Sequence, residues 1–171
     1  MRTIIGSICM IIMLLGSLSL INNEKTVENY KLPVDEHERW EIGWTQVIDG
    51  QEIVEFVPKG QTVEDWKEMI TVQTFDYKVN TKWDIDPYSL MVVCRRGDEK
   101  YGSQIQYVTI IDEPSNVIYE WYAKDCPEVE DQDEITRLYI ENNHLVRMAY
   151  VRKGERMDEK QRLKWIDWIK N

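Results

Sequence analysis

The stretch Gln104–Arg152 constrains the fold more than any other part of the chain, because four β-prone runs follow one another there with short breaks. β-branched and aromatic residues are concentrated in these runs, and such residues favour pleated strands. Pro114 and Asn142-Asn143 mark turns between runs. Because consecutive strands usually pair, we predict neighbouring antiparallel strands. The predicted strands are Gln104–Asp112, Asn116–Tyr122, Ile135–Glu141 and Leu145–Arg152.

Side chains alternate across a strand, so each of these runs presents two faces. A two-residue loop at Asn142-Asn143 would place Arg147 opposite Leu138, on the more apolar face. A three-residue loop, residues 142–144, places Met148 there instead and keeps the charge out of the core. The hydrophobic pattern therefore predicts the longer loop. The predicted core face consists of Val117, Tyr119, Trp121, Leu138, Ile140, Val146, Met148 and Tyr150.

The opposite face of these strands carries charged side chains among aromatic ones and is the predicted ligand-binding surface. It combines Glu120, Arg137 and Arg147, with Tyr122 and Tyr139 at its border. Two guanidinium groups beside a carboxylate offer planar sets of donors that can hold an anionic or carboxylate ligand. The structural alternative is a cross-strand ladder of exposed ion pairs that stabilises the sheet and binds nothing.

The segment before this stretch contains a strong hairpin signal. Trp40–Ile48 and Gln51–Val57 flank Asp49-Gly50, a pair typical of a two-residue turn in which both residues have positive φ. The register of this hairpin predicts one apolar face. That face consists of Ile42, Trp44, Ile48, Ile53 and Val57.

Two helices and one further strand are predicted outside these regions. Thr62 is the expected N-terminal cap of a helix in which Trp66, Met69 and Ile70 share one face. Ser89–Arg95 is read as a strand. A second helix follows Asp158, its expected N-cap. The apolar stripe of this C-terminal helix consists of Leu163, Trp165, Ile166, Trp168 and Ile169.

These elements predict an α+β fold. The chain has 171 residues, of which 11% are aromatic, so one ordered domain is expected. The predicted architecture is an antiparallel sheet of about six or seven strands with two helices packed on one face. The predicted order along the chain is β-β-α-β-β-β-β-β-α.

Residues 1–19 resemble a secretory signal peptide. Arg2 supplies the positive charge, Ile4–Leu15 is an apolar run, and Ser17-Leu18-Ser19 offers the small residues that precede cleavage. The alternative is a retained membrane anchor, because the uncharged run Ile4–Ile21 approaches the length that spans a bilayer. The predicted organisation is a signal peptide, residues 1–19, a polar N-terminal arm, residues 20–38, and a single α+β domain, residues 39–171. We expect the protein to be exported, either periplasmic or extracellular.

Export to an oxidising compartment also bears on the three cysteines. Cleavage would remove Cys9 and leave Cys94 and Cys126, an even pair in a compartment that favours disulfides. A bond between them would hold the acidic loop that contains Cys126 against the sheet. The alternative is two unpaired thiols.

The formal net charge of −10 and the isoelectric point near 4.8 limit the classes of partner. Nucleic acids and anionic membranes repel such a surface, so we expect a protein or small ligand, with a basic partner the better match. A membrane contact is expected only if the N-terminal segment is retained as an anchor.

No catalytic or metal-binding motif is recognisable. His37 and His144 lack other ligands at metal-binding spacing, and no nucleotide-binding glycine loop is present. The acidic run Asp125–Glu134 lacks the alternating aspartates and the glycine of a calcium loop. We therefore predict no cofactor, no metal and no catalytic residue, and a non-enzymatic binding protein. The alternatives are a small enzyme with a pocket around Glu120, Arg137 and Arg147, or an inhibitor or immunity-type protein against a basic partner.

A longer phrase in the first half of the chain carries a resemblance. Pro58-Lys59-Gly60-Gln61-Thr62, then Trp66, then Met69-Ile70-Thr71-Val72-Gln73 is similar to a phrase in small exported bacterial proteins of uncharacterised function. Tyr119-Glu120-Trp121 and the tryptophan-rich C-terminal helix also look family-like. The resemblance implies export and one compact domain, and it supplies no catalytic residue.

Overall fold

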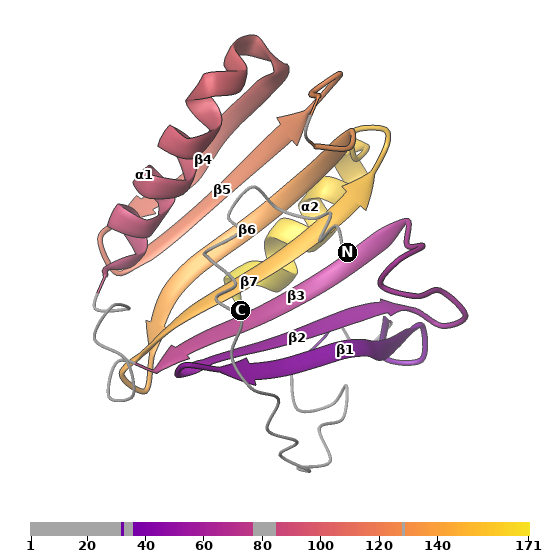
Figure 1. Ribbon diagram of the computed structural model, residues 1–171, viewed down its shortest axis with the longest axis horizontal. Helices are drawn as coiled ribbons and strands as arrows, with labels where there is room; N and C mark the ends of the chain where they lie inside the picture. Colours follow the sequence, from indigo (N-terminus) through magenta and orange to yellow (C-terminus); the bar gives the residue numbers. More distant parts are fainter. Residues whose placement is uncertain (1–31, 33–35, 77–84, 128) are drawn as a thin grey trace.

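Seven strands form one antiparallel sheet in the computed structural model, which describes residues 32, 36–76, 85–127 and 129–171 (Figure 1). The spatial order of the strands is β1-β2-β3-β7-β6-β5-β4. The predicted signal peptide, residues 1–19, lies outside the described residues. The strands are β1 Trp40–Ile48, β2 Gln51–Pro58, β3 Glu68–Asp76, β4 Ile105–Glu113, β5 Asn116–Ala123, β6 Gln132–Glu141 and β7 His144–Lys153.

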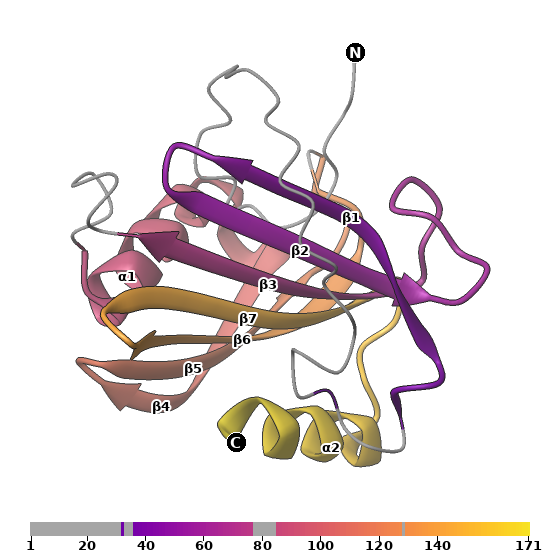
Figure 2. The ribbon, with the colours of Figure 1, turned by 90° about the horizontal axis from the view of Figure 1, so that it is seen from below.

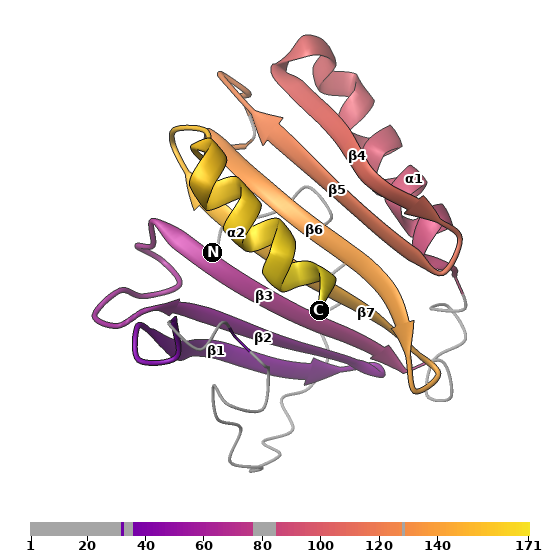
Figure 3. The ribbon, with the colours of Figure 1, turned by 180° about the vertical axis from the view of Figure 1, so that it is seen from behind.

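Two α-helices, α1 (Pro87–Asp98) and α2 (Glu159–Lys170), pack on the sheet, and a 3-10 segment, Glu99–Gln104, follows α1. The predicted α+β class, with seven antiparallel strands and two helices, is confirmed. The predicted placement of both helices on one face is wrong. Helix α1 lies in front of the sheet in Figure 1, and α2 lies in front only when the sheet is seen from behind in Figure 3. Figure 2 shows the twisted sheet with α2 along one side.

Alternation along β5 explains how both helices are accommodated. Val117 belongs to the apolar cluster beneath α1, and its neighbour Ile118 belongs to the cluster beneath α2. Both side chains are fully buried. The central strands therefore have an apolar side chain to bury on each face, and one helix covers each side.

Helix α1 occupies the segment that was predicted to be a strand, Ser89–Arg95. Its start has a clear local cause. The Asp86 carboxylate accepts hydrogen bonds from the Ser89 backbone N–H, at 2.8 Å, and from the Ser89 hydroxyl, at 2.6 Å. Pro87 stands at the first helical position, where its missing N–H and fixed φ suit a helix. These hydrogen bonds from Ser89 hold the pKa of Asp86 below its usual value.

Strand β3 occupies much of the segment that was predicted to be the first helix. The hydroxyl of Thr62 accepts hydrogen bonds from the backbone N–H groups of Glu64 and Asp65, as predicted for a cap, but only a tight turn follows. The chain then pairs along β2 and β7, with Ile70 opposite Phe56 and Tyr150. Pairing on both sides outweighs a short helical spacing of apolar residues.

The β1–β2 hairpin has the predicted turn, with φ of 48° at Asp49 and 74° at Gly50. Its predicted apolar face is correct except at Ile42, which pairs with Phe56 on the α2 side. The register shifts between Ile42 and Trp44, so the bulge at Gly43 moves the two residues to opposite faces. A Cβ on Gly43 would lie 2.9 Å from Val63, so only glycine fits without a shift of that side chain.

The turn between β6 and β7 contains two residues, and the predicted three-residue loop is wrong. Asn142 and Asn143 have φ values of 49° and 67°, which asparagine tolerates, and Glu141 pairs with His144. In this register Arg147 lies opposite Leu138, on the face of α1. The faces predicted for β7 are therefore exchanged.

Aromatic side chains dominate the core on the α2 side. The rings of Tyr150 and Trp165 stack with centroids 3.8 Å apart, and Trp40 meets Trp165 edge to face at 6.1 Å. Asp158 caps α2 as predicted and accepts a hydrogen bond from the backbone N–H of Gln161. Leu32, from the predicted polar arm, is also buried in this core.

Candidate functional site

Two of the predicted site residues, Glu120 and Arg137, hold α2 to the sheet. The Glu120 carboxylate accepts a hydrogen bond from Arg162 of α2 at 2.6 Å. The Arg137 guanidinium donates to the backbone oxygens of Ile169 and Lys170, each at 3.0 Å. These last carbonyls of a helix have no partner within the helix, and they carry the negative end of its dipole. A structural role accounts for both charges.

The two bordering tyrosines lie on the same side of the sheet. Arg156 lies over the Tyr122 ring at 4.9 Å, and Arg137 lies over the Tyr139 ring at 4.3 Å. The Tyr139 hydroxyl is also 3.3 Å from the sulfur of Met148. Burial raises the pKa of the Tyr139 hydroxyl above its usual value. The four predicted residues on this side therefore lie on the face that α2 covers, and Glu120 and Arg137 are the two that bond to the helix.

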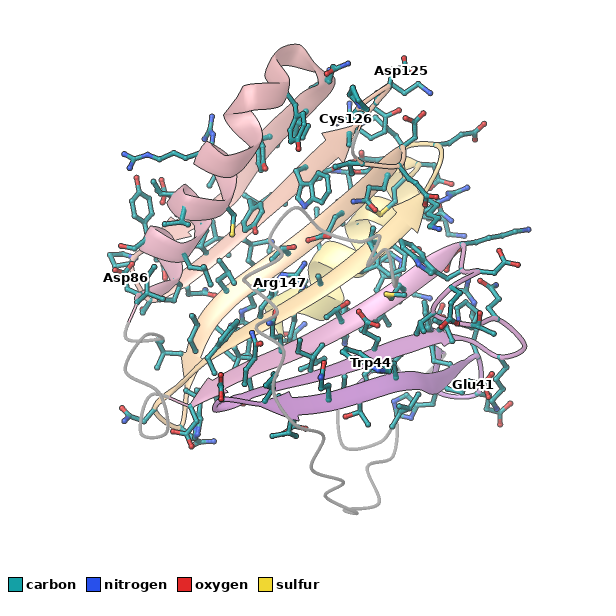
Figure 4. The ribbon with its side chains drawn as sticks, in the orientation of Figure 1. Glu41, Trp44, Asp86, Asp125, Cys126 and Arg147 are labelled. Atoms are coloured by element: carbon teal, nitrogen blue, oxygen red, sulfur yellow. The ribbon has the colours of Figure 1, made fainter. Side chains whose placement is uncertain are left out.

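Arg147 does not join them, because the two-residue turn places it on the opposite face. Its Nη2 donates to Glu134 of β6 at 2.7 Å, and both side chains are at least 95% buried. The hydroxyl of Thr136 also donates to the Glu134 carboxylate. Glu120 and Arg137 therefore form no joint pocket with Arg147, so the pocket on which the alternative of a small enzyme depended is not formed. Figure 4 shows Arg147 near the middle of the α1 face.

Arg147 and Glu134 are part of a buried polar strip on that face. The strip consists of five polar side chains from three neighbouring strands. Neither the nitrogen nor the oxygen of the Gln132 amide has a hydrogen-bond partner among the described residues. Polar groups buried in this way cost stability unless something satisfies them. The polar strip consists of Gln73, Gln132, Glu134, Thr136 and Arg147.

Glu55 lies next to the polar strip on β2. It pairs across the ladder with Thr71 of β3 on one side and with Trp44 of β1 on the other. Burial raises the pKa of the Glu55 carboxyl, and the positive charge of Arg147 lowers it by less. Glu55 therefore interacts electrostatically with the same guanidinium group that is hydrogen-bonded to Glu134.

A second buried carboxyl, Asp133, points to the α2 side. Burial raises its pKa to about 6, although a hydrogen bond from the Met157 backbone N–H at 2.9 Å opposes the shift. The nearby charge of Glu120 adds to the increase. Asp133 holds the segment that leads into α2, and this contact gives it a structural role.

The predicted disulfide between Cys94 and Cys126 is not formed, because Cys126 is a free, buried thiol. Both residues belong to the apolar cluster between α1 and the sheet. Cys94 lies on helix α1, whereas the prediction placed it at the end of a strand.

Sequence reasoning missed Glu134 and Gln132 because it assigned both to an acidic loop, Asp125–Glu134. Strand β6 begins at Gln132, three residues earlier than predicted. No periodic signal marked them. Gln132, Asp133 and Glu134 are three polar residues in a row, so this stretch shows no alternation of polar and apolar side chains.

Known proteins add little. No protein-family model matches the chain, and no curated protein matches it either. Within the described part of the chain, no three His, Cys, Asp or Glu side chains are grouped so that they could hold a metal ion. Neither of the two helices described is long and apolar enough to cross a membrane.

Proposed function

We propose that this is an exported, non-enzymatic binding protein whose ligand contacts the α1 face of the sheet at the polar strip. The observation that carries the proposal is the buried pair Glu134–Arg147, in which two charges are withdrawn from water within the sheet. Apolar residues of similar volume at such positions are commonly neutral or stabilising. A sheet with a buried charge pair at this position is less stable than one with apolar residues there. Recognition of a polar ligand would explain why the charges are present.

Binding suits this site better than catalysis. The guanidinium of Arg147 and the carboxylate of Glu134 neutralise each other at 2.7 Å, so neither is set up as a free base or nucleophile. The unpartnered amide of Gln132 offers both a donor and an acceptor to a ligand. Paired charges with neighbouring amides can orient a polar molecule without reacting with it.

Export is supported by the charged N-terminus, the apolar run and the small residues of the first 19 positions. Its test is the location and mass of the chain in the cells that make it. We expect the mature protein in the periplasmic or extracellular fraction, beginning at Leu20. The full-length polypeptide dissolved in the cytosol would overturn this part of the proposal.

The test of binding is native mass spectrometry of the protein purified from that fraction. A bound small molecule should be retained by the unmodified protein. It should be lost from the double variant Glu134→Met/Arg147→Met, which removes both charges and leaves neither partner alone in the core. Circular dichroism and thermal unfolding establish that this variant is folded.

A matched control is the variant Glu120→Gln, which removes a charge from the α2 side of the same sheet. It should retain the ligand. Equal retention of ligand by the double variant would show that the α1 face does not bind it, and absence of any ligand or partner would contradict the proposal.

A further inference from the structure

The outer hairpin places an aromatic ring and a carboxylate side by side next to the polar strip. Trp44 of β1 and Glu55 of β2 are direct cross-strand partners, so both side chains project to the α1 face. Both are only partly buried, unlike the strip itself. Figure 4 labels Trp44 on this hairpin and Arg147 at the middle of the sheet. The polar face therefore continues to an accessible edge.

Charge is not balanced across this part of the face. Among the described residues, Glu55 and Glu134 are two carboxylates, and a single guanidinium, that of Arg147, is shown acting on both. Arg147 is bonded to Glu134, and no hydrogen bond or ion pair to the Glu55 carboxylate occurs among the described residues. With both carboxylates ionised, two negative charges meet one positive charge. A further cation would complete the set.

Gln51 gives an independent indication of a ligand. It lies on the same strand and the same face as Glu55, four residues away, and its side chain is 5% exposed. Its amide nitrogen is buried and has no hydrogen-bond partner in the described part of the protein. A buried donor of this kind requires an acceptor. A ligand with a cationic end and a carbonyl or hydroxyl group would supply both needs.

We propose that Trp44 and Glu55 form a binding site for an alkylguanidinium or alkylammonium group. The cation lies over the indole ring of Trp44 and donates hydrogen bonds to the carboxylate of Glu55. Such a cation is attracted by the ring face and by the charge together. The inference rests on the proposed binding function and adds the class of ligand. The net charge of −10 favours the approach of cations over a long range.

Titration of the full chain with arginine methyl ester tests the site. The matched ligand is citrulline methyl ester, which has nearly the same shape but no charge on its side chain. Binding is followed by calorimetry and by the indole N–H resonance of Trp44, assigned with the variant Trp44→Phe. We expect the arginine ester to bind and to shift this resonance, and the citrulline ester to do neither.

Three variants locate the site. Glu55→Gln should weaken binding by about tenfold or more, because it removes a charged hydrogen-bond acceptor. Trp44→Leu should weaken it by about fivefold through loss of the ring. Glu52→Gln is the matched control, because it removes the same charge from β2 on the opposite face. It should bind as the unmodified protein does.

A short peptide containing a single arginine distinguishes the source of the cation. Binding of the peptide that depends on Glu55, with or without binding of the free ester, supports the site. Unchanged affinity in Glu55→Gln, or equal loss in Glu52→Gln, would refute it. Absence of binding by both probes at millimolar concentration would also refute it.

Failure here can be told apart from failure of the proposed function. If a ligand detected by native mass spectrometry depends on Glu134 and Arg147 but is retained by Glu55→Gln, the binding function holds and the cation site is wrong. If no ligand is retained while the arginine ester binds at Glu55, the cation site holds and the polar strip is not the contact surface.

Discussion

The two faces of the sheet bury charge in different ways. On the α2 face, Glu120 and Arg137 each bond to the helix itself, through Arg162 and through the last carbonyls of α2. On the α1 face, Glu134 and Arg147 both belong to the sheet and bond to each other. The first arrangement fixes where a helix packs. The second holds two charges inside the sheet itself.

On the α2 face the buried charges have a structural role. On the α1 face the structure alone gives no such role for them. An ion pair that joins two elements supplies orientation, and the helix cannot slide without breaking it. A buried pair within one sheet adds little to orientation, since the backbone ladder already sets the register. The α1 face is therefore the better candidate for ligand contact, although four of the five ligand-binding residues predicted from the sequence lie on the α2 face.

The largest expected effect is on the α2 face, at the ring stack. Trp165→Ala removes the contacts of Trp165 with Tyr150, Trp40 and Trp168. We expect it to lower the free energy of unfolding by about 3–5 kcal/mol, as for other large-to-small core changes. Urea unfolding measures the loss.

Leu163→Ala is the matched control on the same helix, because Leu163 is 54% exposed. Its effect should stay within about 0.5 kcal/mol. A similar loss in both variants would mean that the ring stack is not what holds α2 in place.

The second prediction concerns the pair on the α1 face. Arg147→Met leaves the Glu134 carboxylate buried without its guanidinium and should lower the free energy of unfolding by about 3 kcal/mol. Adding Glu134→Met should restore most of this loss, because two well-packed apolar side chains replace the pair. Denaturant unfolding of the single and double variants measures the coupling.

The same pair of measurements at Glu120 and Arg162 sharpens the comparison. The Arg162 side chain is 25% exposed, so solvent screens that pair and its loss should cost only about 1 kcal/mol. If the Glu120–Arg162 pair proved the stronger of the two, the contrast between the faces would fail.

The third prediction is a dependence on pH at Asp133. Its pKa is about 6 in the folded protein and 3.8 when exposed, so the folded protein holds its proton more tightly than the unfolded chain. The free energy of unfolding should therefore fall as the pH rises from about 4 to about 6, by at most about 3 kcal/mol, and level off above that.

Asp133→Asn should remove this fall and stabilise the protein above pH 6, because the amide oxygen can still accept the Met157 N–H. Thermal unfolding between pH 4 and pH 8 tests it. A variant with the same pH profile as the unmodified protein would assign the dependence to another group.

Short-range signals in the sequence predicted several elements correctly. The Asp49-Gly50 turn, the four strands between Gln104 and Arg152, and the helix after Asp158 all depend on neighbouring residues, and all occur in the structure. Two segments were exchanged. The apolar run at the start of β3 and the run in α1 are both short, and in such runs helical and strand spacing overlap. The Asp86-Pro87 start of α1 was the local signal that resolves the second segment.

The candidate site was harder to predict than the fold. Asp133 and Glu134 are adjacent acidic residues, yet their side chains lie on opposite faces of the sheet. Residue type alone does not show which of the two faces which side. A lone arginine in the core is costly, and for that reason the hydrophobic pattern favours the longer turn. The cost falls when Glu134 meets it at 2.7 Å across the β6–β7 ladder.

The amino-acid sequence alone was sufficient for the class of fold, most of the strands, the Asp49-Gly50 turn and the C-terminal helix, because each of these depends on residues within a few positions of one another. The face on which each charge lies, the side that each helix covers and the partner of each buried carboxylate emerged only from the assembled sheet. These features depend on contacts between strands that are distant in the chain, and a one-residue change in a turn reverses them.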